Sequence, residues 1–206
     1  MIVDIIKRAG YPNFNTDNEP HAVLARLPFP LYMTTNYDDF MFKALENANK
    51  FPSLFVNEWN HEKTTEETTV DIDPSVGNPA VYHFHGHKDY INSIVLTEDD
   101  YLDFLVKISK DPNLIPPRIQ HALAGTQLLF IGYSLGDINF RVIFRGLVET
   151  LKRNMRRVSI AVQLRPDKPE VFQYLTEYFD ASNIRVFWGT AREFVAELEC
   201  RWSKLT

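Results

Sequence analysis

Short apolar runs alternate with stretches of helical periodicity along most of the chain. This alternation predicts a layered α/β fold with a largely parallel sheet. The apolar runs predict strands at 31–35, 54–57, 80–85, 127–131, 159–163 and 185–188. The stretches of helical period predict helices at 2–9, 19–26, 39–49, 98–109, 117–124, 138–152, 168–179 and 191–203.

Two stretches interrupt this pattern. Residues 58–78 are polar and acidic, which predicts a solvated loop or hairpin outside the core. Residues 90–125 form a small helical insertion that is bent by prolines near its middle. Within the regular part of the chain, Thr97 and Asp137 each precede a helical pattern and are predicted to be helix N-caps.

Composition favours one globular domain over residues 1–206. With 45% hydrophobic residues, a chain of 206 residues can bury a sizeable core. No apolar run approaches the ~20 residues that span a bilayer, and the N-terminus lacks the basic and apolar blocks of a secretory signal. We therefore expect a cytoplasmic protein without a membrane segment.

Charge and cysteine content narrow the possible partners. The formal net charge of -5 gives no basic footprint for nucleic acid, and the basic cluster at 152–157 is predicted to lie at the C-terminal end of a helix. The single cysteine, Cys200, excludes an intramolecular disulfide and a four-cysteine zinc module.

Polar residues and glycines suited to a binding or catalytic site lie at the carboxyl ends of three of the predicted strands. They are Thr34, Thr35, Asn36 and Asp38 at the first, His85 and Gly86 at the third, and Gly132, Ser134 and Asp137 at the fourth. In open α/β sheets, ligands bind in the crevice outside the carboxyl ends of the strands. The three strand ends are therefore predicted to meet in one pocket.

The motifs at these ends resemble those of a known family. TTNYDD, then FHGH followed by IVLTEDDY, and then LLFIGYSLGDINFR resemble the sirtuin-like (silent information regulator two) superfamily. The resemblance covers roughly residues 29–188 and is greatest to the bacterial branch found in antiphage defence. It implies a Rossmann-like, doubly wound sheet, with the segment at 90–125 in the place of the small sirtuin domain.

The resemblance also implies an activity. Members of this branch hydrolyse NAD to nicotinamide and ADP-ribose, so NAD is expected as substrate and no metal is expected. Homo-oligomers are expected, or complexes with an Argonaute, a helicase-type ATPase or a sensor module. A protein deacylase is disfavoured because the cysteine module is missing.

The same resemblance assigns roles to the strand-end residues. Asn36 matches the asparagine that orients water and ribose, and His85 matches the histidine that acts as base. Asp38 is expected to position Asn36 and the ribose edge. Thr34, Thr35, Gly86, Gly132, Ser134 and Asp137 are expected to hold the nucleotide. Cleavage through an oxocarbenium-like state needs such a polar group and such a base.

Other interpretations of these residues stay open. Asn36 is also compatible with an ordinary turn residue, His85 with a packed core histidine, and Asp137 with the N-cap described above. His83, His85 and His87 alternate, which on a strand would place them on one face as zinc ligands.

One expected motif is missing. Sirtuin-like proteins begin with a strand that leads into a glycine-rich turn, where backbone amides hold the pyrophosphate, and Gly10 follows no apolar strand. We therefore expect a chain incomplete at its N-terminus that binds NAD weakly by itself. The alternative function is a non-catalytic nucleotide-binding or assembly module of a defence complex.

Overall fold

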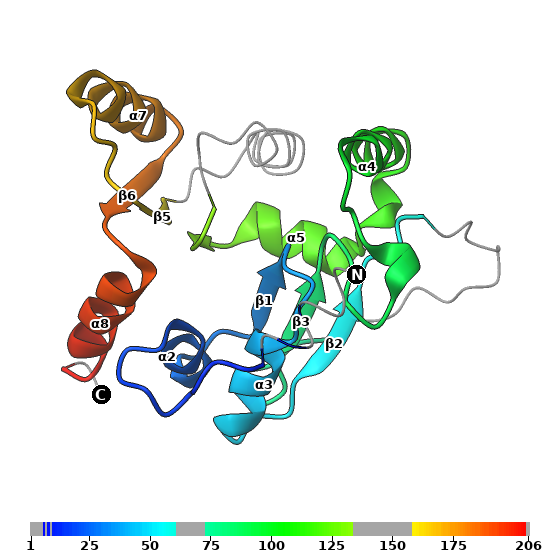
Figure 1. Ribbon diagram of the computed structural model, residues 1–206, viewed down its shortest axis with the longest axis horizontal. Coiled ribbons are helices and arrows are strands. Elements are labelled where there is room, and N and C mark those ends of the chain that lie inside the picture. Colours follow the sequence, from blue (N-terminus) through cyan, green and yellow to red (C-terminus); the bar gives the residue numbers. More distant parts are fainter. Residues whose placement is uncertain (1–5, 7, 9, 61–72, 134–157, 205–206) are drawn as a thin grey trace. The chain divides into compact units, whose positions relative to one another are not determined.

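The computed structural model describes residues 6, 8, 10–60, 73–133 and 158–204 (Figure 1). The chain divides into two compact units, Met1–Arg118 and Ile119–Thr206, which are described separately. In the described residues, each unit contains a three-stranded sheet in which every pair of strands is parallel. The predicted α/β class with parallel strands is confirmed, and the grouping of both units into one domain stays a prediction.

The sheet of the first unit places β3 in the centre. Strands β1 (Leu31–Thr34) and β2 (Ser53–Val56) pair on either side of β3 (Ala80–His83). All four residues of β3 are buried, as expected for a central parallel strand with Val and Tyr in its sequence. Val81 of this strand packs with Ala25, Ala44 and Leu45, which come from two helices.

Those two helices are α2 (Pro20–Arg26) and α3 (Phe40–Asn47), and they contact each other (Figure 1). Helix α2 begins with Pro20, whose missing N–H needs no partner there, and the Glu19 carboxylate accepts a hydrogen bond from the Ala22 N–H at 2.7 Å. Their small and branched side chains allow the helices to lie close to Val81.

Helix α4 (Glu98–Lys110) follows the short η1 (Ile91–Ser93). Thr97 and Asp100 form a capping box at its start, which confirms the predicted N-cap. The short η2 (Pro112–Leu114) and helix α5 (Pro117–Gly125) complete the helical segment, and the prolines lie where α4 ends and α5 begins, as the predicted bend requires. Phe104 of α4 is fully buried.

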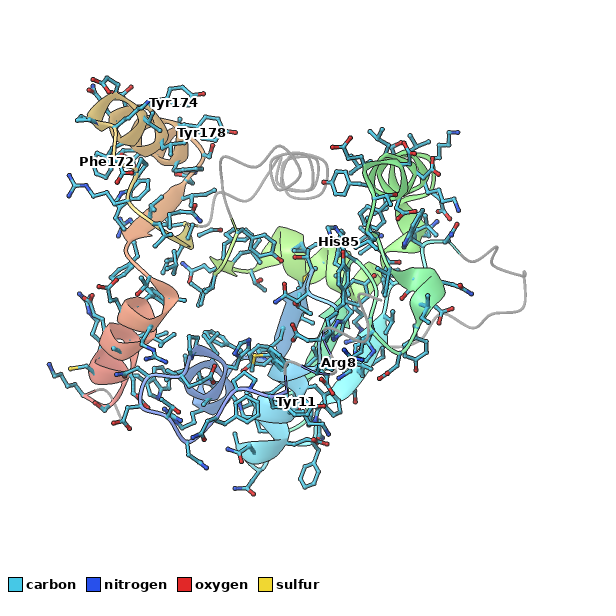
Figure 2. All side chains as sticks on the ribbon, viewed as in Figure 1. Arg8, Tyr11, His85, Phe172, Tyr174 and Tyr178 are labelled. Atoms are coloured by element: carbon cyan, nitrogen blue, oxygen red, sulfur yellow. The ribbon has the colours of Figure 1, made fainter. Side chains whose placement is uncertain are left out.

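In the second unit, β5 (Ser159–Gln163) lies between β4 (Leu129–Phe130) and β6 (Ile184–Trp188). Helix α7 (Pro169–Ala181) contributes Phe179 to a core with Ala161 and Ile184. Helix α8 (Ala191–Trp202) begins with a second capping box, made by Thr190 and Glu193. Figure 2 labels Phe172, Tyr174 and Tyr178 on α7, and the Phe172 ring contacts Trp188 of β6 at 5.0 Å between centroids.

The six predicted strands are all present, and most bounds shift by one or two residues. Helices predicted at 2–9 and 138–152 lie largely or wholly outside the described residues. The strand predicted at 80–85 ends at His83, because the chain turns there toward Gly86, whose φ is 90°. Part of the predicted solvated loop is also wrong: Trp59 is 2% exposed, and its ring packs on Phe104 with centroids 5.9 Å apart.

No helix in the part of the chain that the structure describes is long and apolar enough to cross a membrane.

Candidate functional site

The candidate site lies where β1 and β3 end. The two strands are parallel neighbours, and Thr34 and His83 are partners in their register. Asn36 and His85 therefore each follow, by two residues, the end of a strand at the same edge of the sheet. The two residues thus follow neighbouring strands, whereas their meeting in one pocket and their roles in catalysis stay predictions.

Asn36 has an exposed side chain and a restrained main chain. Its backbone N–H donates to the Thr34 hydroxyl oxygen at 3.0 Å. Its carbonyl oxygen lies 3.1 Å from Nδ1 of His83. An asparagine in an ordinary turn bonds its own backbone through its side chain, whereas here Thr34 and His83 provide the contacts.

His85 is packed among aromatic rings, and Figure 2 labels it. Its ring centroid lies 5.2 Å from that of Phe104 and 5.8 Å from that of Tyr101, both on α4. Its Nε2 is buried and has no hydrogen-bond partner among the described residues. Burial lowers the pKa of His85 to about 4, so the imidazole is neutral near pH 7 and has a free lone pair.

A turn of the chain's own backbone closes over His85. The Val95 N–H donates to the His85 carbonyl oxygen at 3.0 Å, and the Tyr37 hydroxyl donates to the Val95 carbonyl oxygen. The backbone beside Gly86 is that of Ser93 and Ile94, within 3 Å of where a Cβ would lie. The close approach that the glycine permits is therefore to protein backbone, and the predicted contact of Gly86 with nucleotide stays a prediction.

The three alternating histidines separate into two environments. The rings of His83 and His87 are in contact, 4.7 Å apart between centroids, whereas His85 packs against α4. Strand alternation cannot hold all three on one face, because β3 ends at His83. In the described parts of the chain, no group of three or more His, Cys, Asp or Glu residues is arranged to hold a metal ion.

The residues after Asn36 also stabilise the start of α3. Asp38 accepts a hydrogen bond from the Phe40 N–H at 3.0 Å, a local contact typical of a helix start. The structure gives no contact between the side chains of Asp38 and Asn36. The predicted roles of Asp38 and Thr35 toward ribose and nucleotide stay predictions.

A buried ion pair near this edge was missed by the sequence analysis. Lys88 and Asp39 form a salt bridge, and Tyr11 donates to Asp39 at 2.9 Å. Burial raises the pKa of Asp39, but the contacts with Lys88 and Tyr11 outweigh it and lower the pKa. The only signal in the sequence is that Asp39 is the last residue of the first motif and Lys88 follows the FHGH motif.

The third predicted strand end belongs to the second unit. Gly132 follows β4 with a φ of 80° and has open space where a Cβ would lie. Ser134 and Asp137 lie outside the described residues. The expectation that this end joins the other two in one pocket therefore stays a prediction.

Known proteins are similar in sequence to this chain. Residues 30–187 match the family described as SIR2-like domain. The NAD(+) hydrolase ThsA of Bacillus cereus (strain MSX-D12) is 31% identical over 160 residues, which are 78% of this chain and 31% of that protein. The NAD(+) hydrolase ThsA of Enterococcus faecium is 34% identical over 140 residues, 68% of this chain and 27% of that protein.

A third relative, the NAD(+) hydrolase ThsA of Acinetobacter baumannii (strain 532279), is 27% identical over 153 residues, 74% of this chain and 29% of that protein. The chain spans less than a third of the length of these relatives. The family match covers most of the chain and includes residues of both units. The chain therefore belongs to the SIR2-like domain family, as the strand-end motifs predict.

Proposed function

We propose that this chain carries the active site of an NAD hydrolase, which cleaves the bond between nicotinamide and ribose to give nicotinamide and ADP-ribose. The observation that carries the proposal is the placement of an exposed asparagine, Asn36, and a neutral imidazole, His85, after neighbouring strands at one edge of the sheet. Relatives 31% and 34% identical to this chain over the matched residues are named NAD(+) hydrolase.

The chemistry fits these two groups. The nicotinamide of NAD is cationic and leaves as a neutral molecule, so no strong general acid is required. The ribose develops oxocarbenium character, and water attacks it with loss of a proton. Asn36 orients the water and the ribose through its exposed amide. His85 accepts the proton at Nε2, the ring nitrogen that has no partner among the described residues.

We also propose, from the resemblance of the motifs, that the activity serves bacterial antiphage defence and is controlled by assembly with a partner. Hydrolysis of NAD is toxic to the cell that performs it, so the chain without a partner is expected to hydrolyse NAD slowly.

The proposal is tested with a fluorescent etheno-NAD analogue, whose signal rises when the nicotinamide bond is cleaved. Asn36→Ala removes an exposed amide, and His85→Phe keeps a ring against Phe104 but has no lone pair. Both changes are expected to lower the rate by a factor of about 100 or more. Matched controls are Asn47→Ala and His121→Ala, which remove exposed side chains elsewhere and should keep the activity.

Calorimetric titration with NAD distinguishes the hydrolase from the alternative function, a non-catalytic nucleotide-binding or assembly module. Binding of NAD without release of nicotinamide would show a nucleotide-binding module in place of an enzyme. Hydrolysis that survives both active-site substitutions would overturn the assigned roles of Asn36 and His85.

A further inference from the structure

Both polar groups of the Asn36 main chain are bound by two side chains. The N–H donates to the Thr34 hydroxyl oxygen at 3.0 Å, and the carbonyl oxygen is 3.1 Å from Nδ1 of His83. Thr34 and His83 are direct partners in the register of β1 and β3. One cross-strand pair therefore makes both contacts, and its position is set by the sheet.

The contact with the carbonyl fixes the tautomer of His83. A carbonyl oxygen only accepts hydrogen bonds, so Nδ1 must carry a proton. The ring is fully buried, and this burial, followed by the proximity of His87, lowers the pKa of His83 to about 4. Near pH 7 the ring is therefore neutral, with its single proton on Nδ1 and a lone pair on Nε2.

The His87 ring packs against the His83 ring. The two rings meet edge to face, with an interplanar angle of 85°. Nδ1 of His87 accepts a hydrogen bond from the Asp89 N–H at 3.2 Å, so the proton of the neutral His87 ring is on Nε2. His87 is itself 2% exposed, which leaves the His83 ring little freedom to rotate.

The side chain of Asn36 is exposed, whereas hydrogen bonds restrain both polar groups of its main chain. The nearby Asp38 shows the ordinary arrangement, because its side chain bonds the local backbone. A restrained backbone with an exposed amide is the arrangement expected when the amide must meet a substrate in one orientation.

We propose that His83, together with Thr34, is a positioning residue for Asn36. The pair clamps the Asn36 main chain in one position, from which its side-chain amide reaches ribose and water. What the presented amide does rests on the proposed function, whereas the clamp itself is a property of the fold. Thr34 thus acts through Asn36 in addition to any contact with the nucleotide.

Two matched pairs of variants test the catalytic consequence. His83→Asn keeps an N–H near the position of Nδ1, and His83→Leu removes it. Thr34→Ser keeps the hydroxyl, and Thr34→Val removes it with little change of shape. We expect kcat to fall about 10- to 100-fold in the Leu and Val variants, with KM changed less than about threefold, and to fall much less in the Asn and Ser variants.

Equal losses within each pair would overturn the proposal, because packing alone would then explain them. An unchanged kcat in both Leu and Val variants would overturn it as well. The two pairs are independent, so the Thr34 pair decides the outcome if His83→Leu fails to fold.

A measurement without NAD separates the clamp from the proposed function. Long-range ¹H–¹⁵N NMR spectra of the wild-type chain report which ring nitrogen of His83 carries the proton. We expect the proton on Nδ1. We also expect the backbone N–H of Asn36 to exchange with solvent at least about tenfold faster in Thr34→Val than in Thr34→Ser. A proton on Nε2, or equal exchange in the two variants, would overturn the clamp even if NAD is hydrolysed. Both expected NMR results in a chain that leaves NAD intact would sustain the clamp and refute only the proposed function.

Discussion

Gly86 lies so close to Ser93 that a Cβ added to Gly86 would be 2.2 Å from the Ser93 carbonyl oxygen. The same carbonyl oxygen accepts a hydrogen bond from Nε1 of the buried Trp59 at 2.9 Å. The turn that carries His85 is thus fixed by backbone contacts, and three separate segments of the first unit meet at it.

This contact predicts a large effect of Gly86→Ala. The new methyl group would collide with backbone, and alanine disfavours a φ of 90°. We expect the free energy of unfolding to fall by more than about 2 kcal/mol in urea denaturation. Gly77→Ala, where a Cβ meets nothing within 4 Å, is the control and should change it by less than about 0.5 kcal/mol. Equal stability of the two variants would show that the turn is not packed as described.

The Lys88–Asp39 pair supplies a second prediction. Lys88→Met leaves the Asp39 carboxylate without its cation in a site where the two side chains are only 10% and 15% exposed. We expect a loss of about 2–4 kcal/mol of unfolding free energy, measured by urea denaturation at pH 7.

The matched control is Lys43→Met, which breaks the exposed pair with Glu46. The side chains of that pair are 41% and 45% exposed, and we expect a change of less than about 0.5 kcal/mol. A similar, small effect of both substitutions would contradict a stabilising role of the buried pair.

The sequence was sufficient to predict the α/β class and the placement of Asn36 and His85 at strand ends. These features depend on local signals, namely apolar runs, helical period and polar residues at strand ends. The contact of His83 with Asn36 could not be predicted, because it depends on the register between β1 and β3. Periodicity within one strand carries no information about register.

Two further features could not be predicted from the sequence for related reasons. Trp59 stands in a polar stretch, and its burial depends on Phe104 and Ser93, which are more than thirty residues away. The salt bridge of Lys88 joins residues 49 positions apart. Such long-range pairs follow from tertiary packing, which a single sequence does not display.

The buried histidines predict a dependence of stability on pH. The pKa values of His83 and His85 are lowered from 6.5 to about 4 in the folded chain, mainly by burial. Between these two values the unfolded state binds protons that the folded state does not. The contribution of these two rings to the free energy of unfolding is therefore expected to be greatest above pH 6.5 and to fall as the pH drops toward 4. Below pH 4 the two rings should cause no further decrease.

Urea denaturation at pH 6.5 and pH 5 measures this effect for one ring. We expect the decrease in unfolding free energy between these pH values to be about 1.5 kcal/mol smaller in His85→Phe than in the wild-type chain. An identical decrease in the two proteins would mean that His85 is protonated as readily in the folded state as in the unfolded state.

We propose that Asn36 and His85 together cleave the nicotinamide bond of NAD. The most direct test incubates the chain in excess over NAD and follows nicotinamide and ADP-ribose by ¹H NMR, so that slow turnover is still detected. We predict that the wild-type chain releases the two products in equal amounts, and that Asn36→Ala and His85→Phe, folded as judged by their melting curves, release neither. Failure of the wild-type chain to release nicotinamide, or equal release by the wild-type chain and both variants, would contradict the claim.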